Sequence, residues 1–377
     1  MFIRTRLRHT VAALGAAVLV ASLSACGGSD DKSSASPGSG TTDSVISKAR
    51  CATNKAVGKI TYMSGYYWQA SASILEVIAA DKLGYYKDLC LDVDLQPGQG
   101  DTTVNAKLVQ AGKVQIGPLS EQDILTANAA TLANGGTPKV LGVSSYSNAG
   151  LDILMTEPSI TDLKQIEGKT LGYKGWVPVS VSAMLDKAGV DMTKVKQVKV
   201  GYDPTILTRG QVQALTGFVS NEPNLLKDQG KEVKVWEPKD FGVAGSIGSF
   251  AVNSDWAKAH PDTVDDFLRA TFKAFQYCAE PANIAACIDL QQKQGDNPSD
   301  DKAHQTDVWT TESQLVADNP LPGRWGSVDP ANITSLVGDV NTYAGSKIDD
   351  KVAQTWFTNR YVDAVVNDDG TVIWPPK

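Results

Sequence analysis

The chain has 377 residues, which is too long for one ordinary hydrophobic core and predicts two lobes or domains. With 42% hydrophobic and 20% charged residues, its composition is that of a globular protein. The formal net charge is −7 at pH 7 and lysine and arginine do not cluster, which argues against nucleic acid as a partner.

The first 25 residues form a unit that differs from the rest of the chain. Arginines at positions 4, 6 and 8 precede an apolar run from Val11 to Leu23, which is too short to cross a bilayer. A basic segment followed by a short apolar one is typical of an export signal. We therefore expect an exported protein whose signal peptide spans residues 1–25.

The signal ends in Leu23-Ser24-Ala25-Cys26, which resembles the lipobox of bacterial lipoproteins. The resemblance implies that a lipid on Cys26 anchors the protein to the outer face of the bacterial cytoplasmic membrane. An ordinary cleaved signal with a chance cysteine is the alternative. Because Ser33 to Ser44 is poor in apolar residues, we expect residues 26–54 to form the lipid anchor and a flexible linker.

Four further cysteines follow: Cys51, Cys90, Cys278 and Cys287. In an exported protein they suggest two disulfides, and pairing of sequence neighbours is the most economical of the three possible connectivities. Free buried thiols are the alternative. A metal site is not expected, because no histidine lies near either pair.

Strand-like and helix-like segments alternate through the first part of the body. In chain order we expect a strand at 59–64, a helix at 70–82, a strand at 91–95, a helix at 102–111, a strand at 114–119, a helix beginning at Ser120 and a strand at 139–145. Such alternation predicts parallel strands with right-handed crossovers, and hence an α/β sheet with helices on both faces.

The same alternation of strand-like and helix-like segments then begins again. Extended segments are expected at 151–157, 169–173, 196–202, 213–219, 232–237 and 249–254, with helices near 162–168, at 178–188, from Asn221 and at 261–278. Two extended connections, near residues 150 and 248, predict a hinge between lobe 1 (55–149 with 249–377) and lobe 2 (150–248). Ligands bind at the carboxyl ends of the strands in such sheets.

Enzyme signatures are missing from the sequence. The three histidines, His9, His260 and His304, cannot be assembled into a general base or a metal cluster. The sequence also lacks a glycine-rich phosphate loop, G-x-S-x-G and CxxC. We therefore expect a protein that is not an enzyme and that uses no cofactor and no metal.

The unusual residues lie in the loops that follow strands. The aromatic runs at 66–68 and 173–176 come from opposite lobes, and facing aromatics can clamp a flat ring. Packing of each aromatic within its own lobe is the alternative. The predicted ligand contacts are Tyr66, Tyr67, Trp68, Ser120, Glu121, Tyr146, Tyr173, Trp176, Asp203, Asn221 and Glu222.

Several stretches between Val57 and Asp289 resemble the substrate-binding proteins of ABC importers in the NMT1/THI5-like group, which is related to nitrate, sulfonate and taurine binding proteins. They are "AADKLGYYKDLCLDVDLQPGQGD", "KLVQAGKVQIGPLS", "LKQIEGKTLGYKG" and "NSDWAKAHPDTVDDFLRATFKAF". The resemblance implies a two-lobed type II periplasmic-binding-protein fold. It also implies delivery of a small solute to a membrane permease driven by a separate ATPase. Relatives usually carry aspartate where this chain has Gln115.

The identity of the solute stays open between two chemistries. Among the candidate loops only Lys174 is basic, with Arg209 further along, and the loops also carry aromatics and acids, which favours a neutral or weakly cationic ring such as a thiamine-precursor pyrimidine. The alternative is a sulfonate, nitrate or similar small anion. Two further classes are a thiamine-pyrimidine synthase-like enzyme and a surface adhesion or signalling module. We expect a monomer.

Overall fold

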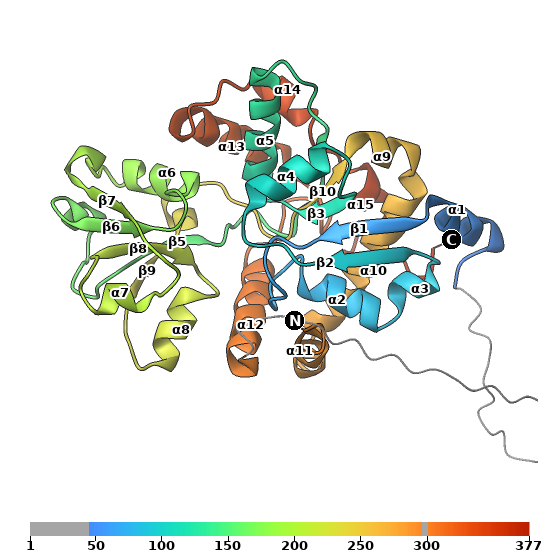
Figure 1. Cartoon of the computed structure of the whole chain (residues 1–377), viewed down its shortest axis with the longest axis horizontal. Coiled ribbons are helices and arrows are strands. Elements are labelled where there is room, and N and C mark those ends of the chain that lie inside the picture. The colour runs from blue at the N-terminus through green and yellow to red at the C-terminus, as the bar shows by residue number, and fades with distance from the viewer. Residues whose placement is uncertain (1–44, 296–300, 377) are drawn as a thin grey trace, which may run out of the picture. The chain divides into compact units, whose positions relative to one another are not determined.

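The computed structural model describes residues 45–295 and 301–376 (Figure 1). The signal peptide, Cys26 and Ser33 to Ser44 lie outside the described residues, so the predictions about export and lipidation stay predictions. Within the described ranges, none of the helices has both the length and the apolar character needed to cross a membrane.

Five strands form the first sheet, in the order β2-β1-β3-β10-β4 (Figure 1). They are β1 (Lys59–Met63), β2 (Asp92–Gln96), β3 (Ile116–Pro118), β4 (Val140–Ser144) and β10 (Phe250–Asn253). β1 runs parallel to β2 and β3, as predicted, but β10 lies antiparallel between β3 and β4. The four strands of the first alternating unit, β1 to β4, therefore run in one direction, and only β10, which enters this sheet directly from the other one without a crossover helix, runs against them.

The second sheet has the order β7-β6-β8-β5-β9. Its strands are β5 (Asp152–Thr156), β6 (Thr170–Tyr173), β7 (Lys196–Lys199), β8 (Ala214–Phe218) and β9 (Lys234–Trp236). β6 is parallel to β7 and β8, whereas β5 is antiparallel to β8 and β9. β5 is again the strand that arrives from the other sheet. The two sheets give the α/β, two-lobed architecture that the sequence predicts, and each sheet with its helices is called a lobe below.

Helices cover both sheets. Those of the first lobe are α2 (Leu75–Lys82), α3 (Tyr85–Asp88), α4 (Thr102–Gln110), α5 (Glu121–Ala133), α9 (Ser254–Ala259), α10 (Pro261–Ala279), α11 (Ile284–Gln292), α12 (Lys302–Asp318), α13 (Pro330–Tyr343), α14 (Asp350–Gln354) and α15 (Arg360–Val365). Those of the second lobe are α6 (Val179–Lys187), α7 (Thr205–Thr208), α8 (Glu222–Asp228) and the 3₁₀ turns at Leu163–Ile166, Met192–Lys194 and Pro238–Phe241. The buried side chains of α2 and α10 belong to one large hydrophobic cluster with those of β1 and β10.

One helix begins earlier than the predicted end of the linker. Helix α1 spans Lys48–Val57, although residues up to 54 were expected to be flexible. Arg50 on this helix forms ion pairs of 2.9 Å with Asp262 and 2.8 Å with Asp266, both on α10. These contacts fix the helix to the body, so the folded part of the chain begins earlier than the predicted end of the linker at residue 54.

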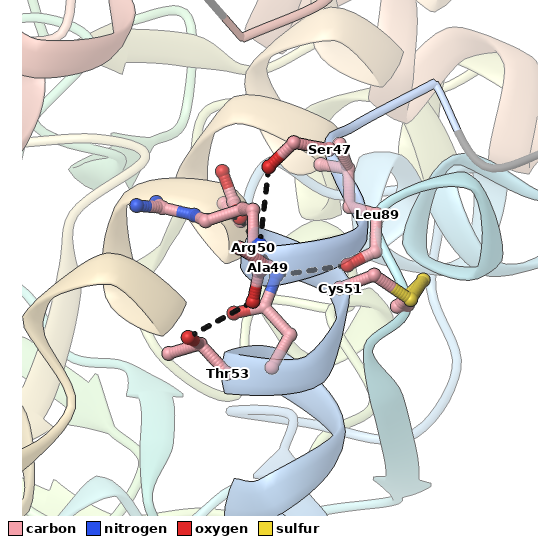
Figure 2. Close-up of a disulfide and its surroundings, with 9 residues drawn as sticks. Ser47, Ala49, Arg50, Cys51, Thr53 and Leu89 are labelled. Carbon is pink, nitrogen blue, oxygen red and sulfur yellow. Dashed lines mark hydrogen bonds and ion pairs between the residues drawn. A yellow bond between two sulfur atoms is a disulfide. The ribbon is translucent and has the colours of Figure 1, made fainter.

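Two disulfides join the four cysteines of the body as sequence neighbours. Cys51 on α1 is bonded to Cys90, which precedes β2, and Cys278 is bonded to Cys287. Figure 2 shows Cys51 and its neighbours on α1 beside Leu89. The prediction of two local disulfides is confirmed, and the first of them ties α1 to the edge of the first sheet.

The chain crosses between the two sheets twice, and the two crossing segments lie side by side. The Ile247 N–H donates to the Ser147 carbonyl at 3.1 Å, and the Gly245 N–H donates to the Asn148 carbonyl at 3.0 Å. A Cβ atom on Gly245 would lie 2.5 Å from the backbone nitrogen of Gly150, which is too close for any other residue. This narrow pair of segments is the connection on which a hinge motion would depend.

Candidate functional site

Loops from the two lobes meet at Tyr66 and Tyr202. Tyr66 follows β1 and Tyr202 follows β7, and burial together with the Tyr202 side chain raises the pKa of Tyr66. The Tyr66 ring lies over Gly100, where an added Cβ atom would come within 2.3 Å of the ring. Tyr67 contacts Tyr66 edge to face, with 5.8 Å between the ring centroids. The aromatic run after β1 therefore reaches the second lobe through Tyr66.

An ion pair lies beside this contact in the second lobe. Lys174, in the loop after β6, pairs with Glu222 at the start of α8. Glu222 is buried, and its other carboxylate oxygen accepts the Phe218 N–H at 2.7 Å. Burial lowers the pKa of Lys174 to about 8, while the adjacent carboxylate favours its charged form. The Lys174 ammonium also lies 5.8 Å from the centre of the Tyr202 ring.

Exposed aromatic side chains gather at this place. Among the described residues, the exposed large aromatics are Tyr67 (37%), Trp176 (54%), Tyr202 (67%) and Phe218 (44%). Tyr67 follows β1, Trp176 follows β6, Tyr202 follows β7, and Phe218 is the last residue of β8. These four positions are all at the carboxyl ends of strands, so the two lobes present aromatic surface to the same region.

Two other predicted ligand contacts, Ser120 and Asp203, form hydrogen bonds within their own loops. Ser120 caps α5 by accepting the Asp123 N–H at 3.0 Å, which confirms the predicted start of that helix. Asp203 is exposed, accepts the Thr205 N–H at 2.9 Å, and pairs with Arg209 at 3.0 Å. These contacts with Thr205 and Arg209 lower the pKa of Asp203. Its carboxylate therefore holds the loop before α7 in place.

Tyr173 and Asn221 lie at the edges of the same loops. Tyr173 is half-buried at the end of β6. The Asn221 side-chain oxygen lies 2.9 Å from Nε2 of His304, which is on α12 in the first lobe. Burial lowers the pKa of His304, which favours its neutral form near pH 7. This pair is a contact between the lobes that the sequence did not predict.

Glu121 is fully buried at the start of α5. Its carboxylate accepts the Asn332 side-chain amide at 2.6 Å, and its N–H donates to the Ser246 hydroxyl at 2.9 Å. Burial raises the pKa of Glu121 to about 8. Because Ser246 belongs to a crossing segment, Glu121 fixes α5 to the hinge and offers little surface to a solute.

Trp68 and Tyr146, both predicted to line the cleft, lie in the core instead. Trp68 is 3% exposed within the hydrophobic cluster of the first lobe. Tyr146 is fully buried, stacks on Trp325 with 5.0 Å between the ring centroids, and donates to Glu76 at 3.0 Å. Residues 65–68 form a bend after the end of β1, and the path of this loop turns the Tyr67 side chain outward and the Trp68 side chain into the core.

A buried glutamate on α12 also reaches the loops of both lobes. Glu312 is 1% exposed, and its carboxylate accepts from the hydroxyl of Ser71 in the loop after β1 and of Ser220 in the loop after β8. The Ala72 N–H donates to the same carboxylate at 2.6 Å. Glu312 is not among the residues predicted from the sequence, because its position on a distant polar helix gives no signal of these contacts.

The described residues contain no group of three or more histidine, cysteine, aspartate or glutamate side chains arranged to hold a metal ion. The structure has two hollows of about 520 and 590 Å³, and the second reaches the loop after β8 at Val219, next to Phe218 in the chain. The first is lined by Arg324 and Asp363, and the second lies between α12 and the turn at Pro238–Phe241. Neither hollow contains a residue of the predicted cleft wall.

The chain has two mixed sheets joined by a double crossing, and loops meet at the carboxyl ends of their strands. This arrangement is that of the periplasmic-binding-protein fold. The periplasmic aliphatic sulphonate-binding protein of Escherichia coli is 14% identical, with a TM-score of 0.57, covering 85% of this chain and 92% of that one. The periplasmic nitrate-binding protein of Synechocystis PCC 6803 is 10% identical, with a TM-score of 0.57, covering 81% of this chain and 87% of that one. At these identities the likeness shows the fold.

A family model described as NMT1/THI5 like matches residues 71–284, more than half of the chain, and the protein belongs to this family. The formylaminopyrimidine-binding protein of Halalkalibacterium halodurans is 24% identical over 249 residues, which cover 63% of this chain and 72% of that protein. The resemblance seen in the sequence is therefore confirmed at the level of the family.

Proposed function

We propose that this protein is the extracytoplasmic solute-binding component of an ABC importer. Its lobes, 55–149 with 249–377 and 150–248, close around a small flat heteroaromatic solute, such as a thiamine-precursor pyrimidine, and deliver it to a membrane permease. The observation that carries this proposal is the gathering of exposed Tyr67, Trp176, Tyr202 and Phe218 at the carboxyl ends of strands from both sheets. Such surfaces bind flat rings by stacking.

The charges of the loops favour a neutral solute over a small anion. A sulfonate or nitrate needs an available positive charge or several free N–H donors. Lys174 is already paired with Glu222, and Arg209 with Asp203. With both cations neutralised by the protein's own acids, the loops suit a ring that stacks and exchanges neutral hydrogen bonds.

The comparisons support the same class of protein. The similar proteins named above are described as binding proteins, and one of them is named for a pyrimidine. The proposal also includes export with a lipid on Cys26 and a monomeric state. Its partners would be a permease and the permease's ATPase.

Binding of a pyrimidine by the purified protein is the first prediction. Titration calorimetry with a formylaminopyrimidine is expected to give one saturable site of about micromolar or tighter affinity, equivalent to about 8 kcal/mol or more. An alkanesulfonate and nitrate serve as the competing anionic solutes. No heat with pyrimidines but tight binding of the alkanesulfonate would overturn the proposal.

Removing the most exposed aromatic of the loops is expected to weaken this binding. Tyr202 is 67% exposed, so Tyr202→Ala loses stacking surface at little cost in stability. We expect the affinity for the pyrimidine to fall by about 1–3 kcal/mol, the scale of ring stacking on aromatic side chains. Leu132→Ala, an exposed apolar residue at the far end of α5, is the control. Equal affinities of the two variants would exclude Tyr202 from the site.

A further inference from the structure

The carboxylate of Glu312 is held by hydrogen-bond donors from both lobes. The Ser71 hydroxyl lies 2.9 and 2.8 Å from its two oxygens, and the Ala72 N–H lies 2.6 Å from one of them. These two residues belong to the loop after β1. The Ser220 hydroxyl, in the loop after β8 of the second lobe, lies 2.7 Å from the other oxygen. Glu312 and Ser220 are 1% and 2% exposed, whereas Ser71 and Ala72 are half-buried.

These donors form a site of the kind that binds an oxyanion. Two hydroxyls and one backbone N–H converge on one point between the lobes, and charge-assisted hydrogen bonds of this kind hold carboxylates and sulfonates strongly. In this chain the point is already filled by the side chain of Glu312. Burial raises the pKa of Glu312 to about 7, so its carboxylate is charged above that pH and would repel a second anion.

The position of Glu312 joins it to the proposed solute cleft. Ser71 and Ala72 lie in the same loop as Tyr66 and Tyr67, and Ser220 lies between Phe218 and Glu222 in the chain. The donors taken by Glu312 are therefore part of the strand-end loops that carry the exposed aromatics. Helix α12 supplies the glutamate from 241 positions after Ser71.

We propose that Glu312 is a specificity-determining residue, whose carboxyl group occupies the oxyanion position formed by Ser71, Ala72 and Ser220. A cleft with this position filled rejects anionic solutes and admits neutral ones. The inference rests on the proposed function, because it names the feature of the same cleft that sets the charge of the solute.

The test is to vacate the position and offer small anions to it. The full chain with Glu312→Ala is titrated at pH 8.5 with sodium acetate and with sodium methanesulfonate, in a background of sodium chloride. We expect a saturable heat for at least one of these anions and an affinity at least about tenfold higher than in the unchanged protein. Glu232→Ala, an exposed glutamate, gives the same change in net charge and is expected to behave like the unchanged protein.

Two further variants make the result specific. Adding Ser220→Ala to Glu312→Ala removes one donor and is expected to weaken the acquired anion binding. If Glu312→Ala does not fold in chloride, recovery of its circular dichroism spectrum by acetate but not by chloride supports the proposal. A folded Glu312→Ala that binds neither anion, or a variant that stays unfolded in acetate, overturns it. Pyrimidine binding by the unchanged protein is measured separately, so failure of this inference and failure of the proposed function are distinguishable.

Discussion

Trp68→Ala is expected to lower the free energy of unfolding by about 3–5 kcal/mol, the usual cost of truncating a large buried aromatic. The Trp68 side chain is 3% exposed within the main hydrophobic cluster of the first lobe, and the Trp68 carbonyl accepts the Gln291 side-chain amide at 2.6 Å. Truncation leaves a cavity in this cluster, which adds to the lost burial of the ring.

Trp176→Ala is the matched control for this prediction, because it removes the same side chain from an exposed position. Trp176 is 54% exposed, so its truncation is expected to change the free energy of unfolding by no more than about 0.5 kcal/mol. Chemical denaturation of both variants measures the difference, and calorimetric titration gives their affinities. We expect Trp68→Ala to lose stability and Trp176→Ala to lose affinity. If Trp68→Ala instead loses affinity and Trp176→Ala loses stability, Trp68 lines the cleft and the prediction is wrong.

The contrast between these two tryptophans shows what the sequence could predict about the site. The alternation of strands and helices places both runs of aromatics after strands, and the structure has them there. Which ring faces outward depends on the path of the loop, which local sequence does not determine. After β1 the outward residue is Tyr67, and after β6 it is Trp176, which follows Gly175 at a φ of 66°.

Contacts between distant parts of the chain were beyond sequence reasoning for a different reason. Glu312 stands on a polar helix and lies 241 positions from Ser71 and 92 from Ser220. Only the packing of α12 against the loops of both lobes gives this carboxylate its role. Similarly, the antiparallel strands β5 and β10 follow from the double crossing between the sheets, whereas the local patterns of these strands resemble those of their parallel neighbours.

Buried glutamates give the stability of this protein an unusual dependence on pH, and Glu76 is the clearest case. Glu76 is fully buried on α2, and burial raises its pKa from 4.5 to about 8, with a further contribution from Glu312. Its carboxyl accepts the Ser73 N–H at 2.7 Å and the Tyr146 hydroxyl at 3.0 Å. Below about pH 4.5 the group is protonated in both the folded and the unfolded chain, and its contribution to stability is fully present.

As the pH rises toward 8, the unfolded chain releases this proton while the folded chain retains it, so the free energy of unfolding falls. The contribution lost is on the order of 3–5 kcal/mol. We expect Glu76→Gln, which keeps the acceptor oxygen but does not ionise, to lack this loss. Urea denaturation between pH 5 and pH 9 gives the free energy of unfolding at each pH. The loss is measured as the difference, between the variant and the unchanged protein, in how steeply this free energy falls with pH. Glu232→Gln, at an exposed position, is expected to follow the unchanged protein. Parallel pH profiles of the unchanged protein and Glu76→Gln would show instead that Glu76 ionises as readily in the folded chain as in the unfolded one.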